Sequence, residues 1–132
     1  MDDEKMEKLA HIRQLKGKIC ENIVSNDLMN RGFSVFTSHE NGNPVDLIAS
    51  KEDLNLRFQV KTATIQNGKV RCWTRRSNSK PPYLKDDFDY FAHVLPNVGL
   101  IFYQHIETVD LNKQSSNIAI KELSTELNRE HS

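Results

Sequence analysis

The fold is decided by Asn43-Pro44-Val45-Asp46-Leu47-Ile48-Ala49-Ser50, followed after a short gap by Leu54-Asn55-Leu56-Arg57-Phe58-Gln59-Val60-Lys61. Apolar and polar residues alternate in the second run, the pattern of a strand with one buried face. Gln59 and Lys61 therefore leave the same face. The first run is apolar and β-branched around Asp46, and residues 51–53 between the runs form a polar turn of hairpin length. We expect this hairpin to bring Asp46 beside Gln59 and Lys61.

A Pro-Val-Asp entering one strand and a Gln-Val-Lys on its partner resemble the motif of the PD-(D/E)XK nuclease superfamily. Gln59 stands where the second acid of the motif is usual. The resemblance spans about residues 17–103 and implies an α/β, restriction-endonuclease-like fold with a central mixed β-sheet flanked by helices. Small intron-encoded homing endonucleases that this chain resembles carry Gln in this place and are active, although the substitution equally suits a site that has lost catalysis.

The first segment, from about Asp3 to Arg31, has helical periodicity and ends at Gly32, a natural C-terminal cap. Its apolar stripe comprises Leu9, Ile12, Cys20, Ile23, Val24 and Leu28. Glu21 falls within that stripe, so this acid either reaches water or pairs with Lys18 at the edge, or it points at the same metal site as Asp46. The resemblance favours the second reading, because the superfamily often has a glutamate there. Gly17 is expected to let the helix approach the sheet closely.

A basic strand is predicted after the tight turn Asn67-Gly68, over residues 69–76. Alternation places Lys69, Arg71, Trp73 and Arg75 on one face, and we expect that strand to adjoin the Gln59/Lys61 strand. Cations interleaved with an aromatic side chain are typical of a surface that grips phosphates and stacks on bases. The candidate DNA-binding residues are Lys69, Arg71, Trp73, Arg75 and Arg76. A solvated strand face is the alternative.

The rest of the chain completes the predicted sheet. Residues 90–95 and 98–103 read as a second hairpin around Pro96-Asn97, residues 112–117 as a loop, and Ile118, Ile120, Leu123 and Leu127 as a final amphipathic segment. We expect residues 1–132 to form a single domain, with its core at about 17–111 and a C-terminal segment at 112–132.

Composition limits the partners and the location. Lys plus Arg and Asp plus Glu both number 18, so a polyanionic partner must be met by a local patch. Cys20 and Cys72 lack metal-type spacing and are expected to be reduced packing residues. No apolar run is long enough to span a membrane, and the first residues do not resemble a secretory or organellar signal. The sequence therefore predicts a cytoplasmic protein without a membrane partner.

The resemblance also implies roles for the clustered residues. Asp46 would be the direct ligand of Mg²⁺ or Mn²⁺, hard cations that prefer oxygen donors. The Val60 carbonyl would be a backbone ligand, and Gln59 would contribute its amide oxygen. Lys61 would orient the attacking water and neutralise developing charge, and Glu21 would hold a second ion or an outer water.

We therefore expect a Mg²⁺-dependent endodeoxyribonuclease that acts on DNA as a homodimer or homotetramer, because cutting both strands with one site per chain needs two copies. Homing, restriction and junction-resolving roles remain open. The first rival is a non-catalytic nucleic-acid-binding module on the same fold, which would bind DNA equally with and without metal. The second is a structural subunit that binds a partner through its C-terminal segment.

Overall fold

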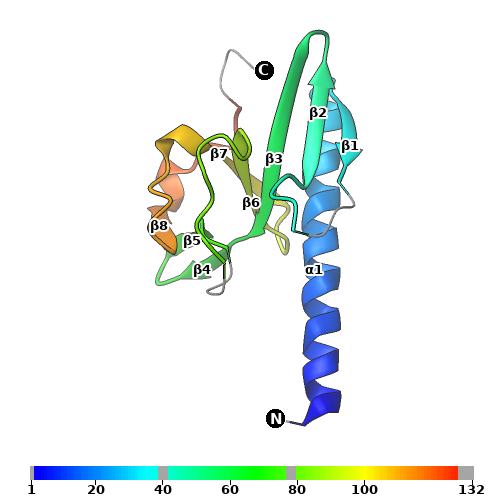
Figure 1. Ribbon diagram of the computed structural model, residues 1–132. Coiled ribbons are helices and arrows are strands. Elements are labelled where there is room, and N and C mark those ends of the chain that lie inside the picture. The colour runs from blue at the N-terminus through cyan, green and yellow to red at the C-terminus, as the bar shows by residue number, and fades with distance from the viewer. Residues whose placement is uncertain (1, 39–41, 77–79, 128–132) are drawn as a thin grey trace.

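The computed structural model describes residues 2–38, 42–76 and 80–127 (Figure 1). Its centre is a five-stranded sheet in the order β1-β2-β3-β6-β7. The strands are β1 (Ser34–Thr37), β2 (Leu47–Lys51), β3 (Leu54–Thr62), β6 (Tyr90–Leu95) and β7 (Leu100–His105). β3 and β6 are parallel, and the other neighbours are antiparallel. The predicted mixed central sheet is confirmed.

Both predicted hairpins of the central sheet are present. β2 and β3 pair from Leu47 with Phe58 to Lys51 with Leu54, which leaves Glu52 and Asp53 as the turn. Glu52 adopts a positive φ of 56°. Type I′ and II′ hairpin turns, which match the twist of the strands, require a positive φ at this first turn position. β6 and β7 pair from Tyr90 with His105 to Leu95 with Leu100. The register places Asp46, one residue before β2, beside Gln59.

α1 (Asp3–Asn30) covers one face of the central sheet through its second half only. Cys20, Val24 and Leu28 are fully buried there, in one cluster with Leu47, Phe58 and Tyr103 of the strands. The helix ends where the sequence predicts: Gly32 has a φ of 93°, and the Phe33 and Gly32 amides donate to the carbonyls of Leu28 and Met29, the Schellman arrangement.

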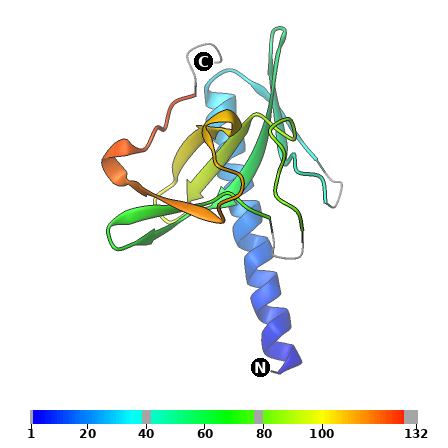
Figure 2. The ribbon, with the colours of Figure 1, turned by 60° about the vertical axis from the view of Figure 1, so that its left-hand side comes forward.

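The first half of α1 corrects the predicted stripe. It projects beyond the lower ends of the strands in both ribbon views (Figures 1 and 2). Leu9 and Ile12 are accordingly 40% and 49% exposed. The expected close approach at Gly17 is also wrong, because a Cβ added there would meet no atom within 4 Å. No described helix has the length and apolarity needed to cross a membrane.

A second, three-stranded sheet packs against the other face of the central sheet beside β6 and β7. It comprises β4 (Thr64–Gln66), β5 (Lys69–Trp73) and β8 (Ser115–Ala119), in that order. The chain passes from β3 to β4 at Ala63, and Ala63, Val70 and Cys72 pack there against Phe102 of β7. Asn67 and Gly68, with φ of 52° and 73°, make the predicted turn between β4 and β5.

This second sheet corrects three expectations. β5 is hydrogen-bonded to β4 and β8 and not to the Gln59/Lys61 strand β3, which it contacts only from the second sheet, and it ends at Trp73 instead of continuing to Arg76. Residues 115–117, predicted as loop, belong to β8. Up to residue 127, where the description ends, the final segment contributes the short helix η2 (Ile120–Glu122). Another short helix, η1 (Ile106–Thr108), follows β7. β8 pairs with β5 across more than forty intervening residues, so no local pattern announces it.

The two halves of α1 make a matched test of this packing. Leu28→Ala should lower the free energy of unfolding by about 2–5 kcal/mol, because Leu28 is fully buried. Leu15→Ala should change it by no more than about 0.5 kcal/mol, since Leu15 is 50% exposed and alanine suits a helix. Urea denaturation followed by circular dichroism measures both, and equal losses would show that the projecting half is packed.

Candidate active site

Asp46 lies where β2 and β3 separate. Its backbone amide donates to the Phe58 carbonyl at 2.8 Å, and its carbonyl accepts from Ser38 at 3.0 Å, so the residue is held between β3 and the end of β1. Two residues further along β3, the Val60 amide donates to the Asp46 carboxylate Oδ2 at 2.8 Å. A side chain thus replaces a neighbouring strand as the partner of that amide. The other oxygen of the Asp46 carboxylate, Oδ1, makes no hydrogen bond to any described residue, so it is available to a ligand.

The environment of Asp46 makes its negative charge costly. Burial raises the pKa of the carboxyl to about 6, opposed by the hydrogen bond from Val60. The charge of Glu21 on α1 raises this pKa further, and the charge of Lys61 lowers it. A carboxylate that is desolvated and faces a second acid gains from any added cation. The structure therefore brings Asp46, Glu21 and Lys61 into one electrostatic group.

Lys61 is half-buried near the end of β3. Burial lowers the pKa of its ammonium, Asp46 opposes this shift, and Arg76 adds to it. Its Nζ lies 3.5 Å from the Arg75 carbonyl and 5.1 Å from the centre of the Tyr83 ring. The register pairs Lys61 with His93 on β6, which burial keeps neutral by lowering its pKa to about 4. Lys61 is thus a partly desolvated cation held between a backbone carbonyl and an aromatic ring.

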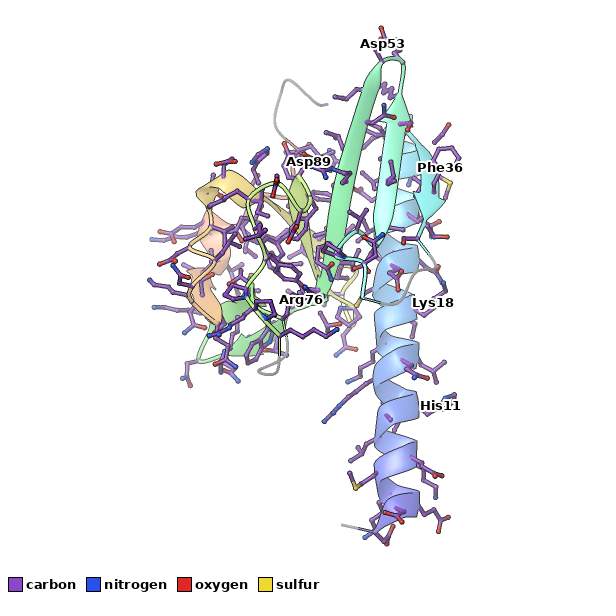
Figure 3. The ribbon with its side chains drawn as sticks, in the orientation of Figure 1. His11, Lys18, Phe36, Asp53, Arg76 and Asp89 are labelled. Carbon is purple, nitrogen blue, oxygen red and sulfur yellow. The ribbon has the colours of Figure 1, made fainter. Side chains whose placement is uncertain are left out.

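An open pocket of about 260 Å³ lies beside this group. It is lined by Gly42, Asn43, Pro44, Gln59, Lys61, Arg76, Lys80 and Tyr83. Arg76 spans it, since its Nη2 donates to the Gly42 carbonyl at 3.1 Å, and Figure 3 shows Arg76 beside the lower end of β3. Asn43 and Pro44 belong to the stretch that decides the fold. Tyr83 was not predicted as a site residue, because it comes from an irregular segment with no periodic pattern.

The remaining candidate ligands with side chains, Gln59 and Glu21, come from different elements, β3 and α1. Gln59 is on the predicted face of β3, with its amide nitrogen 3.5 Å from the Val60 carbonyl. Glu21 is partly buried on α1, next to Cys20, whose Sγ lies 3.2 Å from the Thr62 hydroxyl of β3. No ion pair joins Glu21 to Lys18 within the described parts of the chain. Glu21 thus acts on Asp46 through its charge, without a direct hydrogen bond between the two.

The oxygen donors here fit a hard divalent cation that keeps much of its water. They are the carboxylates of Asp46 and Glu21, the Gln59 amide and the Val60 carbonyl, a set that Mg²⁺ or Mn²⁺ accepts together with several waters. A closed cage is absent: among residues 2–38, 42–76 and 80–127, no three His, Cys, Asp or Glu side chains are grouped to hold a metal.

The candidate DNA-binding residues divide into two places. Lys69, Arg71 and Trp73 share the outer face of β5, as alternation predicts. Arg71 is engaged there: its guanidinium stacks 4.3 Å from the Trp73 ring centre and donates to Ser115 and Gln66. Arg75 and Arg76 follow the end of β5. Arg76 lines the pocket, and the Arg75 carbonyl accepts a hydrogen bond from Lys61. The buried Arg75 Nε has no partner among the described residues.

Comparisons with known proteins bear on the family and the fold of this chain. A family model described as PD-(D/E)XK endonuclease matches residues 11–132. Among solved structures, the fold is similar to that of a bacterial homing endonuclease, I-Ssp6803I, with a TM-score of 0.72, 18% sequence identity, and coverage of 88% of this chain and 84% of that one. No curated protein sequence matched significantly. Because the family model covers most of the chain, including both halves of the motif, this protein belongs to the PD-(D/E)XK endonuclease family.

Proposed function

We propose that this protein is a divalent-metal-dependent endonuclease that hydrolyses phosphodiester bonds in DNA. The observation that carries the proposal is the Asp46 carboxylate, desolvated between β2 and β3 and electrostatically coupled to Lys61 and Glu21. A purely structural site has little reason to keep such a carboxylate, because burying its charge destabilises the fold. Membership of an endonuclease family supports the same conclusion.

Asp46, the Val60 carbonyl and Gln59 would hold Mg²⁺ or Mn²⁺, with Glu21 contributing from α1. When bound, the cation would polarise the scissile phosphate and help to generate the nucleophile. The donor set contains one carboxylate fewer than the usual motif, because Gln59 is neutral. Among the residues that the structure describes, Asp46 and Glu21 would therefore supply the negative charge that retains the cation, and Glu21 would matter more than an outer residue otherwise does.

Lys61 would act on the substrate directly. Its ammonium is near Asp46 and lines the pocket, where it would hold the attacking water toward phosphorus and offset the charge that develops on the phosphoryl oxygens. Burial strengthens this effect, since charges interact more strongly where water is excluded. The bond that breaks is between phosphorus and the leaving deoxyribose oxygen.

DNA would lie across the pocket and its basic surroundings. Arg76 and Lys80 line the pocket, and Lys69 is exposed on β5. We also propose a homodimer or homotetramer, since each chain carries one site and a duplex has two strands to cut. The rival function is DNA binding without cleavage, which the neutral Gln59 keeps open; metal dependence separates the two.

The central test uses Asp46→Asn, which keeps the size of the side chain and an oxygen that accepts from Val60. Wild type should nick supercoiled plasmid with Mg²⁺ and stop with EDTA, whereas the variant should lose at least about 100-fold in rate, because it loses a charged ligand. DNA affinity in EDTA should stay nearly unchanged. A variant within about tenfold of wild type would show that the site is misassigned, and metal-independent binding without nicking would favour the rival.

The raised pKa of Asp46 also predicts that the stability of the fold depends on pH, and the same variant tests this. The pKa of Asp46 is raised in the folded protein to about 6, above its ordinary value, so the folded state binds this proton more tightly than the unfolded chain does. The resulting stability is fully present below about pH 4 and is lost as pH rises through 6. In EDTA, the free energy of unfolding of Asp46→Asn should therefore rise relative to that of wild type by up to about 3 kcal/mol between pH 4 and 7. Urea titrations at several pH values check this, and parallel curves would contradict it.

The basic residues should differ in their salt dependence. Lys69→Ala and Arg76→Ala should each flatten the slope of log K against log salt by about one unit, as expected when one phosphate contact to duplex DNA is removed. Arg71→Ala should flatten it less, because Ser115, Gln66 and Trp73 already engage that guanidinium. Lys5→Ala, exposed on the projecting half of α1, is the matched control. Anisotropy titrations in EDTA measure the slopes. An unchanged slope for Lys69→Ala and Arg76→Ala would show that DNA binds to another face of the protein.

A further inference from the structure

Tyr83 presents an aromatic ring to the pocket from a rigid support. The residue is only 5% exposed. Its ring meets Phe88 at 5.1 Å and Phe91 at 5.9 Å between centroids, at interplanar angles of 82° and 70°. Both partners are fully buried, and Val109 and Leu111 belong to the same cluster. Edge-to-face contacts of this kind restrict both the position and the tilt of a ring.

Two cations of the pocket lie over this ring. The Lys61 Nζ is 5.1 Å from its centre, and the Arg76 guanidinium carbon is 5.5 Å from it, both within the range of a cation–π interaction. Arg76 has a second anchor in the Gly42 carbonyl. Lys61 has a weaker one, since its hydrogen bond to the Arg75 carbonyl is 3.5 Å long, at the limit for such a bond.

We propose that Tyr83 is a positioning residue, whose ring holds the Lys61 ammonium in the active site and allows Arg76 to lie beside it. The inference rests on the proposed nuclease function, since it assigns Lys61 a place in that reaction. Two cations at one pocket repel each other, and the negative face of an aromatic ring offsets part of that repulsion. Without the ring, the long Lys61 side chain would sample other rotamers and leave its position near Asp46.

The ring, and not the hydroxyl, carries this role. The Tyr83 hydroxyl stays protonated, because burial raises its pKa to about 12, and no described residue forms a hydrogen bond with it. Tyr83→Phe keeps the ring and should therefore keep the function. Tyr83→Leu removes the ring but leaves an apolar side chain in the same cluster.

A matched control separates positioning from loss of packing. Tyr103 is 3% exposed and also lies under a cation, with the Arg31 guanidinium 5.5 Å from its ring centre. It contacts the end of α1, where its hydroxyl donates to Asp27, and does not line the pocket. Tyr103→Leu thus removes the same chemical groups at similar burial away from Lys61.

The first measurement is plasmid cleavage under single-turnover conditions, below the melting temperature of every variant. Tyr83→Leu should lower the cleavage rate constant about tenfold, while its DNA affinity in EDTA changes less than about threefold, because Arg76 keeps its bond to Gly42. Tyr83→Phe and Tyr103→Leu should both cleave at nearly the wild-type rate. Equal losses in Tyr83→Phe and Tyr83→Leu would overturn the role of the ring, and an equal loss in Tyr103→Leu would reduce the effect to packing.

The second measurement does not depend on cleavage. The ε-methylene protons of Lys61, assigned in carbon-correlated NMR spectra with Lys61→Arg, should be shifted upfield by the Tyr83 ring current in wild type and Tyr83→Phe. The shift should disappear in Tyr83→Leu and persist in Tyr103→Leu. If wild type cleaves no DNA, the proposed function fails while this experiment still tests the contact. An unchanged Lys61 signal in Tyr83→Leu would overturn the inference.

Discussion

The hydrogen bond from the Val60 amide to the Asp46 carboxylate is the interaction on which the site depends. Up to Phe58, β3 exchanges backbone hydrogen bonds with β2, and Asp46 still donates its own amide to the Phe58 carbonyl. Beyond that point β3 continues beside β6 alone, and its next amide would lose its partner on the β2 side. The Asp46 side chain supplies that partner. Strand separation and an inward-facing carboxylate therefore have one cause, and the space that opens admits Gln59 and Lys61.

This arrangement places charged groups in surroundings that destabilise their charged forms, at the site where the chemistry is proposed. The pKa of Asp46 is raised by burial and by Glu21, while burial lowers that of Lys61. Each group alone is destabilised in its charged form. The Val60 hydrogen bond and then the charge of Lys61 offset this cost for Asp46, and the charge of Asp46 offsets it for Lys61. His93, which pairs with Lys61 across β3 and β6, stays neutral and so adds no further charge to the site. Under the proposed function, the acidic side of the site would bind a cation and the basic side a phosphate, at the expense of fold stability.

Local patterns predicted what local interactions determine. The β2–β3 and β4–β5 turns follow from a few residues each, the C-terminal end of α1 follows from Gly32, and alternation alone placed Gln59 and Lys61 on one face. The failures are long-range. Leu9 and Ile12 have the same periodic spacing as the buried residues of α1, but nothing in the described chain lies beneath them. Likewise β8 joins β5 only through distant pairing, and Tyr83 reaches the pocket from an irregular segment because Phe88 and Phe91 hold it.

The neutral Gln59 changes the balance of charge in the site. With a second acid at that position, the described part of the site would hold three carboxylates including Glu21. With glutamine it holds those of Asp46 and Glu21. Electrostatic retention of a metal is then weaker, whereas repulsion of the DNA backbone by the site is also smaller. Such a site should depend more on bound DNA to complete the coordination of its cation, since phosphate oxygens supply the missing negative charge. That coupling would tie metal binding to substrate binding, and the loss of one protein carboxylate need not imply loss of catalysis.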